Sequence, residues 1–185
     1  MKISLKNIIF RIRNKVRMDK NNFLEVANNS KVVACHISIK GKNNKVFIGE
    51  NTKIRDSKIE ISGENCSVSI LNNCVIGHGC YFVAKESNVN IEIGNGCMLS
   101  RNVNVMASDG HAIFDDNHER VNHSNSVKIG DGVWLADNVT ILKGVSVGEG
   151  SVVGINSTLS KSIPIHCVAV GNPAKVVRES VNWEY

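Results

Sequence analysis

Three of the six histidines of this 185-residue chain lie in one short polar segment. The segment, ASDGHAIFDDNHERVNHSNS, contains His111, His118 and His123, and Asp109 lies two residues before the first of them. An imidazole titrates near pH ~6.5, so it can accept and release a proton at neutral pH, and its neutral form also binds metal ions. The segment therefore indicates either proton transfer or metal binding. Which of these applies depends on the scaffold that holds it.

The residues after this segment repeat with a period of six. From Lys128 to Lys161 an aliphatic side chain stands at every sixth position, whereas a helix repeats near ~3.6 residues and a strand every two. A second row lies two residues before each of these positions, which predicts short strands separated by turns rich in Gly, Asp and Asn. Three such strands close one triangular coil of 18 residues. The two rows are Ile129, Leu135, Ile141, Val147, Val153 and Leu159, and Val127, Val133, Val139, Val145, Ser151 and Ser157.

The same pattern continues upstream with less regular spacing. Ile48, Ile70 and Ile93 are 22 and 23 residues apart, so we expect small insertions to bulge at the corners of the coils. The interval from Ile93 to Ile129 is 36 residues, twice the coil length. Residues 108–126, which include the histidines, must therefore leave the stack as a loop, and loops on a rigid scaffold are where function concentrates. A sandwich of short strands is the alternative architecture.

This lattice resembles the hexapeptide-repeat family, whose members fold as left-handed parallel β-helices. The elements SDGHAIFD, VWLADNVTILKGVSVGEGSVVGINSTLSKSIP and AVGNPAKVVRE are similar to the branch that includes sugar and polysaccharide O-acetyltransferases. The resemblance implies an all-β fold with an extruded loop and short N- and C-terminal helices. It divides the chain into a basic amphipathic cap (1–25), the β-helix (26–178) and a tail (179–185).

The resemblance also implies an activity, which is acetyl transfer from acetyl-CoA to a sugar hydroxyl in a surface polysaccharide or its precursor. His111 falls on the general base of the family, and Asp109 is placed to orient its imidazole or to contact the substrate. Trp134 precedes the core position Leu135, so its indole should point away from the core and shape the acyl and acceptor pocket. Family members form homotrimers with active sites between neighbouring subunits.

By the same similarity, one set of residues falls on the contacts to acetyl-CoA. Asp137 and Ile155 differ from the small residues usual at those points, so we expect only their backbones to take part. The three cations of the set suit the phosphates of coenzyme A. No metal is expected. The set is Ala136, Asp137, Gly154, Ile155, Ser160, Lys161, Lys175 and Arg178.

Three other functions compete with this one. The same mechanism suits a small amine, a sugar nucleotide or an antibiotic as acceptor. A non-catalytic β-helix scaffold is the second alternative. The third is a carbonic anhydrase of the gamma type, whose zinc ligands include two histidines with the spacing of His118 and His123. That site lacks a third ligand, because the earlier position is Phe82 and His78 lies in a turn.

The net charge of +5 comes from the N-terminus, since residues 1–20 hold seven of the 22 Lys and Arg residues and one of the 17 acids. A basic segment this local does not indicate nucleic-acid binding. Its apolar residues Leu5, Ile8, Ile9, Ile12 and Val16 fall on one helical face, which predicts a cap for the solenoid or a peripheral contact with anionic lipid.

The remaining features indicate a cytoplasmic protein. No apolar run approaches the ~18 residues of a membrane span, and the first 20 residues lack the pattern of a secretory signal. The six cysteines show no CxxC pairing, so we interpret them as small, reduced and buried residues.

Overall fold

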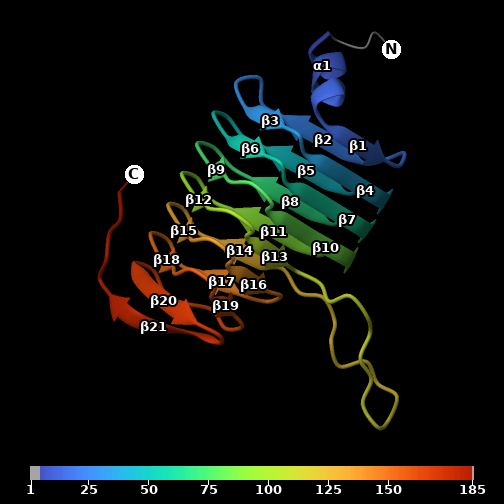
Figure 1. Cartoon of the computed structure of the whole chain (residues 1–185). Helices are drawn as coiled ribbons and strands as arrows, with labels where there is room; N and C mark the ends of the chain where they lie inside the picture. The colour runs from blue at the N-terminus through green and yellow to red at the C-terminus, as the bar shows by residue number, and fades with distance from the viewer. Residues whose placement is uncertain (1–4, 185) are drawn as a thin grey trace.

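In a computed structural model of the chain, residues 5–184 are described, with side chains from residue 9 onward. The chain winds into a three-sided prism in which each side is a β-sheet built from successive coils (Figure 1). We call the sides faces A, B and C in the order in which the chain visits them, and the edges between them AB, BC and CA.

Every neighbouring pair of strands on faces A and B is parallel, because each coil adds one strand to each face. Face A contains β1 (Lys15–Met18), β4 (His36–Lys42), β7 (Lys58–Glu64), β10 (Tyr81–Ser87), β13 (Asn104–Met106), β16 (Thr140–Leu142) and β19 (Thr158–Leu159). Face B contains β2 (Phe23–Val26), β5 (Lys45–Ile48), β8 (Ser67–Ile70), β11 (Asn90–Ile93), β14 (Val127–Ile129) and β17 (Ser146–Val147).

Face C ends differently from the other two. It contains β3 (Lys31–Val33), β6 (Lys53–Arg55), β9 (Val75–Ile76), β12 (Met98–Leu99), β15 (Trp134–Leu135), β18 (Val152–Val153), β20 (Cys167–Gly171) and β21 (Ala174–Glu179). The last strand, β21, folds back antiparallel on β20. The predicted C-terminal helix is therefore wrong, because the chain ends its stack with a hairpin and the described residues contain a single helix.

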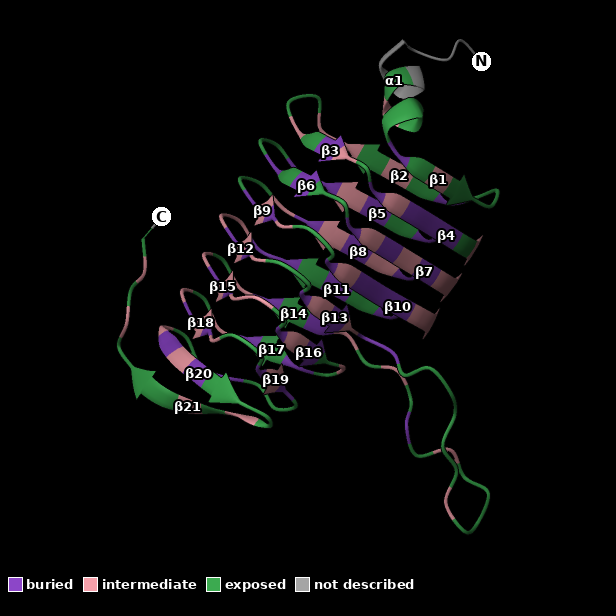
Figure 2. Cartoon of the chain, viewed as in Figure 1, coloured by how far each residue is buried: buried purple, intermediate pink, exposed green. Residues whose placement is uncertain are grey.

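The predicted rows of core residues are confirmed. Ile129, Leu135 and Ile141 are fully buried, as are their partners in the coils on either side, and buried residues recur in the strands of successive coils (Figure 2). The interior is mostly apolar, and Ser151 and Ser157 of the second row are buried with it. The cysteines belong to this interior. All six are buried and unpaired, and burial raises the pKa of the Cys80 thiol to about 11.

Asparagine turns the chain at the edges. At edge CA, Asn102, Asn138 and Asn156 adopt φ values of 56°, 60° and 57°, a left-handed conformation that asparagine tolerates better than most residues. Their side chains also form a ladder, since each amide donates to the oxygen of the next, at 3.1 and 2.9 Å. These bonds align successive coils.

The N-terminal coils are longer because their face A strands are longer. β4, β7 and β10 have seven residues each, whereas β16 has three. The extra residues thus extend one face, and the expectation that they bulge at corners is wrong. Gly63 lies where these strands approach closely, and a Cβ atom there would be 1.6 Å from the Glu86 carbonyl oxygen.

Helix α1 (Leu5–Arg13) is shorter than the predicted cap. Lys15–Met18 and Phe23–Val26 already pair with face A and face B strands, so the prism begins before residue 26 and Val16 belongs to a strand. Phe10 packs against the core, whereas Ile12 is 78% exposed. The predicted positions Leu5 and Ile8 have side chains outside the described residues. No helix within the described part of the chain is long and apolar enough to cross a membrane.

Candidate active site

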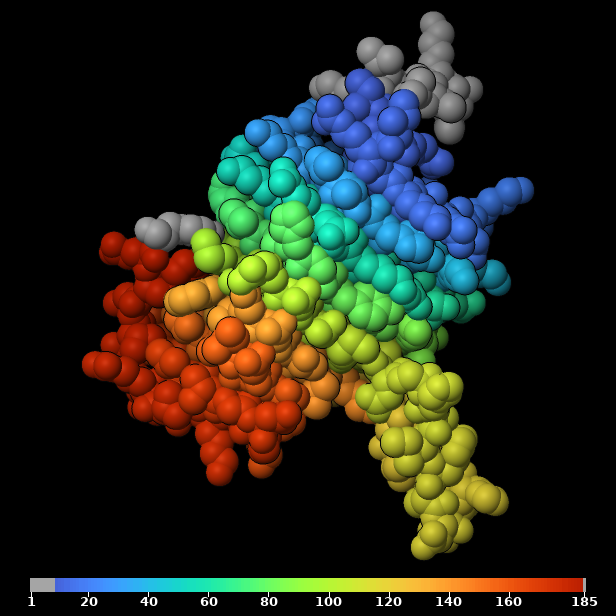
Figure 3. All heavy atoms as spheres, in the orientation of Figure 1, coloured from blue at the N-terminus to red at the C-terminus, as the bar shows by residue number. Residues whose placement is uncertain are grey.

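The extruded loop is confirmed, and it leaves the prism at edge AB. It runs from the end of β13 to the start of β14, and it projects as a separate arm in Figure 3. Its neck is closed by a hydrogen bond of 3.0 Å from Asn125 N to Ala107 O. The register of the coils continues across the interruption, because β11 pairs directly with β14 through Ile91 and Val127.

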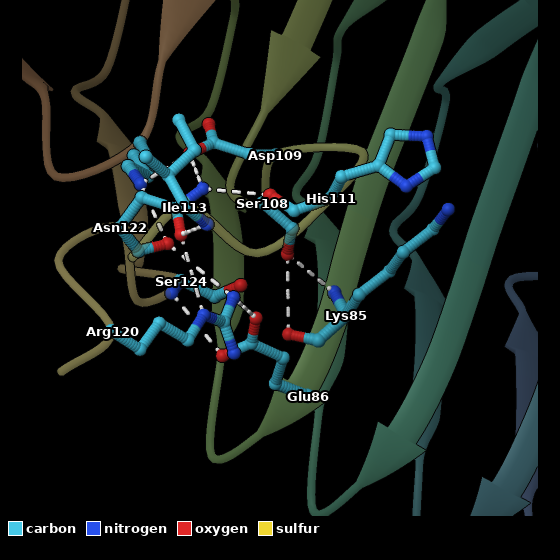
Figure 4. A network of polar contacts seen from close by, with 10 residues as sticks. Lys85, Glu86, Ser108, Asp109, His111, Ile113, Arg120, Asn122 and Ser124 are labelled. Atoms are coloured by element: carbon cyan, nitrogen blue, oxygen red, sulfur yellow. Dashed lines mark hydrogen bonds and ion pairs between the residues drawn. The ribbon is translucent and has the colours of Figure 1, made fainter. Parts of the chain in front are cut away.

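Asn122 fixes the backbone around His111. The residue is 8% exposed and lies on the returning limb of the loop. The amide nitrogen donates to the His111 carbonyl oxygen at 2.8 Å, and the amide oxygen accepts from Ile113 N at 2.6 Å. Asn122 thus bonds to the backbone directly after the residue that carries the imidazole (Figure 4), while His111 itself is exposed and its ring forms no hydrogen bond within residues 5–184.

Glu86 ties the loop to face A. Its carboxylate accepts a hydrogen bond from the Arg120 guanidinium and another, of 3.2 Å, from Ser124 N. Burial opposes ionisation of Glu86, but these bonds outweigh it and lower its pKa below the ordinary value. The backbone of Glu86 has φ +80°, a conformation that costs a non-glycine residue energy. In the two preceding coils the same register position is Gly41 and Gly63.

Asp109 binds the opposite side of the same network. Its carboxylate accepts from Lys143 Nζ at 2.5 Å and from Asn122 Nδ2 at 2.8 Å. The hydrogen bond from Lys143 lowers the pKa of Asp109, so this carboxylate is ionised at neutral pH. The sequence predicts that Asp109 orients the imidazole of His111 or contacts the substrate. Its carboxylate contacts Lys143 and Asn122 instead, so it holds the neck of the loop.

Trp134 lies on face C with its side chain pointing outward, since its neighbour Leu135 is buried. The indole is half-buried. Its Nε1 donates to Ser100 Oγ at 3.3 Å, and the ring of Trp183 lies 5.8 Å away with a tilt of 45° between the planes. A residue of the tail therefore covers the predicted pocket residue, which the sequence did not indicate.

The residues expected to bind acetyl-CoA fall into three groups. Ala136, Asp137, Gly154 and Ile155 lie at edge CA, Ser160 and Lys161 lie at edge AB, and Lys175 and Arg178 lie on β21. The Asp137 carboxylate accepts bonds from the backbone and guanidinium of Arg101, so its side chain already has a structural partner. None of the three predicted cations forms an ion pair with another described residue.

One chain does not assemble these parts. His111 is carried by the loop at edge AB, whereas the pairing of β15 places Trp134 on face C. Among the described residues, no group of three or more His, Cys, Asp or Glu side chains could hold a metal ion.

Sequence reasoning missed the residues that hold the loop: Glu86, Arg120, Asn122 and Lys143. The segment is rich in polar residues, so no spacing distinguishes Asn122 from its neighbours. Glu86 had a signal, because it occupies a register column in which the two earlier coils have glycine.

Comparisons with known proteins agree with this fold. The family model for the bacterial transferase hexapeptide (six repeats) matches residues 126–161. Polysialic acid O-acetyltransferase of Escherichia coli O1:K1 / APEC is 38% identical over 106 residues, which are 57% of this chain and 34% of that protein. The chain thus spans about a third of the length of this curated relative.

Two solved structures extend the likeness to nearly the whole chain. The polysialic acid O-acetyltransferase OatWY is 34% identical, with a TM-score of 0.71 over 93% of this chain and 90% of OatWY. AntD, an N-acyltransferase from Bacillus cereus crystallised with dTDP and 3-hydroxybutyryl-CoA, is 20% identical, with a TM-score of 0.70 over 95% of this chain and 88% of AntD. The likeness to AntD is one of fold alone. The chain therefore belongs to the hexapeptide-repeat acetyltransferase family, as its repeats predicted.

Proposed function

We propose that the chain is an acetyl-CoA-dependent O-acetyltransferase that acts on a sugar hydroxyl of a surface polysaccharide or its precursor. The observation that carries this proposal is an exposed imidazole, His111, whose backbone Asn122 fixes through hydrogen bonds with the His111 carbonyl oxygen and Ile113 N, in a chain 34% identical to OatWY. Such a group has the freedom to reach a substrate and a defined position from which to do so.

The reaction needs one proton acceptor. A nitrogen of the His111 imidazole takes the proton of the acceptor hydroxyl while the oxygen attacks the thioester carbonyl. The tetrahedral intermediate then collapses, the carbon–sulfur bond breaks, and the imidazolium returns its proton to the departing thiolate. Because both substrates are bound together, no acyl-enzyme forms. AntD, with the same fold, was crystallised with an acyl-CoA derivative, which supports a coenzyme A thioester as the donor.

The cations at the C-terminal end of the prism are suited to the phosphates of coenzyme A. Lys161, Lys175 and Arg178 are exposed and are not paired with described acids. At edge CA, backbone groups are suited to hydrogen bonds with the pantetheine arm of coenzyme A, and they belong to Ala136, Asp137, Gly154 and Ile155. Ser160, at edge AB, adds a hydroxyl group. Trp134 forms a wall of the pocket that receives the acetyl group and the acceptor.

A homotrimer would bring these groups together. Face C carries an outward apolar row of Val75, Met98, Trp134, Val152 and Val168, all partly buried in one chain. The loop exposes Ile113, Phe114 and Val121, each to more than half of its surface. Apolar surfaces of this kind mark interaction sites. We infer that the loop of one subunit lies against face C of the next, so that His111 and a neighbour's Trp134 share one cleft.

The oligomeric state is tested by sedimentation. The substitution Met98→Glu places a charge in the apolar row and should convert trimers into monomers, whereas Ser146→Glu, on the exposed surface of face B, should not. Monomeric wild-type protein that retains full activity would contradict the shared cleft.

The N-terminal end is a candidate for contact with an anionic membrane. Ile9 and Ile12 are exposed on α1 beside Arg11 and Arg13, and a groove of about 1320 Å³ lies between this helix and the first coils. Such a contact suits a cytoplasmic enzyme that modifies lipid-linked glycans. Replacing Ile12 and Arg13 by Glu should abolish sedimentation with phosphatidylglycerol vesicles. Unchanged sedimentation would leave α1 with a capping role alone.

The catalytic proposal is tested by thiol release from acetyl-CoA. The acceptor panel contains polysialic acid, a neutral polysaccharide, a sugar nucleotide, an aminoglycoside and a small amine. We expect turnover with a polysaccharide and a loss of about 10²- to 10⁴-fold in kcat for His111→Ala. His123→Ala changes an exposed histidine of the same loop and should retain wild-type turnover.

Each contrary outcome has a distinct meaning. Equal turnover in wild type and His111→Ala would remove His111 from the mechanism. Turnover restricted to the amine or the sugar nucleotide would reassign the acceptor. Silence of both proteins with every acceptor would favour a scaffold.

A further inference from the structure

The C-terminal tail turns back over the prism after β21. The chain bends at Ser180, which has φ 56°, and Figure 1 shows the tail running from the end of β21 along the stack toward the N-terminal coils. Hydrogen bonds between described residues attach it to the coils. Val181 N donates to His166 O at 2.9 Å, and Trp183 Nε1 donates to the Gly132 carbonyl oxygen at 2.6 Å. Gly132 is two residues before Trp134, so the second attachment lies beside the predicted pocket.

The chain has two tryptophans, and the tail brings them into contact. The ring centroids of Trp134 and Trp183 are 5.8 Å apart, within the range in which aromatic pairs attract. Each indole also has its N–H bonded, Trp134 to Ser100 in the preceding coil and Trp183 to Gly132. An indole on an outward face can rotate about two side-chain bonds. Here a hydrogen bond on one side and a second indole on the other restrict that rotation.

We propose that Trp183 is a positioning residue that holds the Trp134 indole in the orientation required by the acetyl-transfer pocket. This inference rests on the proposed function, in which Trp134 forms a wall of the pocket. Trp183 acts through Trp134. Its loss should therefore lower kcat more than it raises KM, because a displaced pocket wall disturbs the reacting geometry while most binding contacts remain.

Three variants separate the parts of the contact. Trp183→Ala removes both the ring and the N–H group. Trp183→Phe keeps an aromatic ring and removes the hydrogen bond to Gly132. Asn182→Ala alters an exposed neighbour in the same tail and serves as the control.

The first measurement is spectroscopic and needs no substrate. Because the chain has two tryptophans, Trp134 is the sole indole in either Trp183 variant. Wild type and Asn182→Ala should show the circular-dichroism couplet of two close indoles near 230 nm, and both Trp183 variants should lose it. Fluorescence from Trp134 should shift to the red in Trp183→Ala and less in Trp183→Phe, since phenylalanine still shields the ring.

The second measurement is thiol release with the acceptor found for wild type. We expect kcat to fall about tenfold in Trp183→Ala and about threefold in Trp183→Phe, with KM changed less than twofold and thermal midpoints close to wild type. Asn182→Ala should match wild type.

The outcomes keep the two hypotheses apart. Wild type without turnover on any acceptor refutes the proposed function. Active wild type with an equally active Trp183→Ala refutes only the positioning role. A couplet that persists in Trp183→Ala would show that the two rings do not meet in solution, which also overturns it. Loss of activity that phenylalanine does not partly restore, together with a lowered thermal midpoint, would assign Trp183 to stability instead.

Discussion

In the prism, Phe82 and Leu135 lie wholly inside the stack, whereas in the loop Ile113, Phe114 and Val121 are more than half exposed. The prism is thus held by apolar burial. The loop is held by the Glu86–Arg120 ion pair, the bonds of Asn122 and the Asp109–Lys143 contact. The difference teaches that fold and site depend on different interactions. A substitution should therefore be able to damage one and spare the other, and four predictions test that separation.

A cavity in the prism should have the largest effect on stability. Phe82 is fully buried in β10, so Phe82→Ala should lower the free energy of unfolding by about 3–5 kcal/mol. Folded protein should retain kcat near the wild-type value, because the loop anchors are unchanged. Urea unfolding and thiol release at low temperature measure the two quantities. A large loss of kcat in fully folded protein would break the comparison.

Removal of the Asn122 side chain, which we call the loop clamp, should lower kcat strongly and change the stability of the prism little. Asn122→Ala deletes the side-chain bonds to the His111 carbonyl oxygen, Ile113 N and the Asp109 carboxylate. We therefore expect kcat to fall about 10- to 100-fold, while the free energy of unfolding of the prism changes by about 1 kcal/mol. Asn117→Ala, at the exposed tip of the same loop, is the control and should have no effect. Equal kcat for the two variants would show that the clamp does not position the imidazole.

Glu86 lies in a prism strand, and its carboxylate holds the loop. Substitutions at this position should therefore change stability and kcat independently. Glu86→Gly relieves the positive φ but removes the anchor for Arg120 and Ser124. We expect kcat to fall about tenfold, while the free energy of unfolding stays level or rises by up to about 1 kcal/mol. Glu86→Gln, which keeps the strained backbone, should lose kcat without that gain. A fall in stability with unchanged kcat would reverse the assignment.

The smallest expected effect is a loss of stability at low pH through protonation of Glu60 on the prism. Hydrogen bonds from Lys58, Tyr81 and Lys85 lower the pKa of Glu60 from 4.5 to about 2. A lowered pKa means that the stabilisation is complete above pH 4.5 and is lost as the pH falls toward 2. The wild-type thermal midpoint should therefore fall more than that of Glu60→Gln between pH 5 and pH 3. Parallel curves would show that this cluster contributes nothing measurable.

The same division explains what could be predicted from the sequence. One inward position of each short strand is aliphatic from Ile129 to Leu159, so the sequence shows the period of six, and the longer interval before Ile129 locates the loop. The extra residues of β4, β7 and β10 were misplaced because a longer strand and a bulged corner leave the same spacing between core positions.

The site was predicted less completely than the fold. The proposed base, His111, comes from a local motif, whereas the contacts that hold the loop are polar pairs between residues far apart in sequence. Glu86 and Arg120 are 34 residues apart, and Trp134 and Trp183 are 49 apart. Pairs of this kind do not repeat at a fixed spacing, so the periodicity of the sequence cannot predict them. The same limit applied to Asp109, whose partner Lys143 follows 34 residues later.

The closed neck of the loop has a consequence for the coils around it. Ala107 and Asn125 meet across 3.0 Å, and the strands on either side stack as if the intervening residues were missing. The arm is therefore an insert that leaves the stacking of the coils intact, although Glu86 and Lys143 of the prism hold its neck. A change in the length or sequence of the arm beyond its neck therefore need not shift the register of any coil.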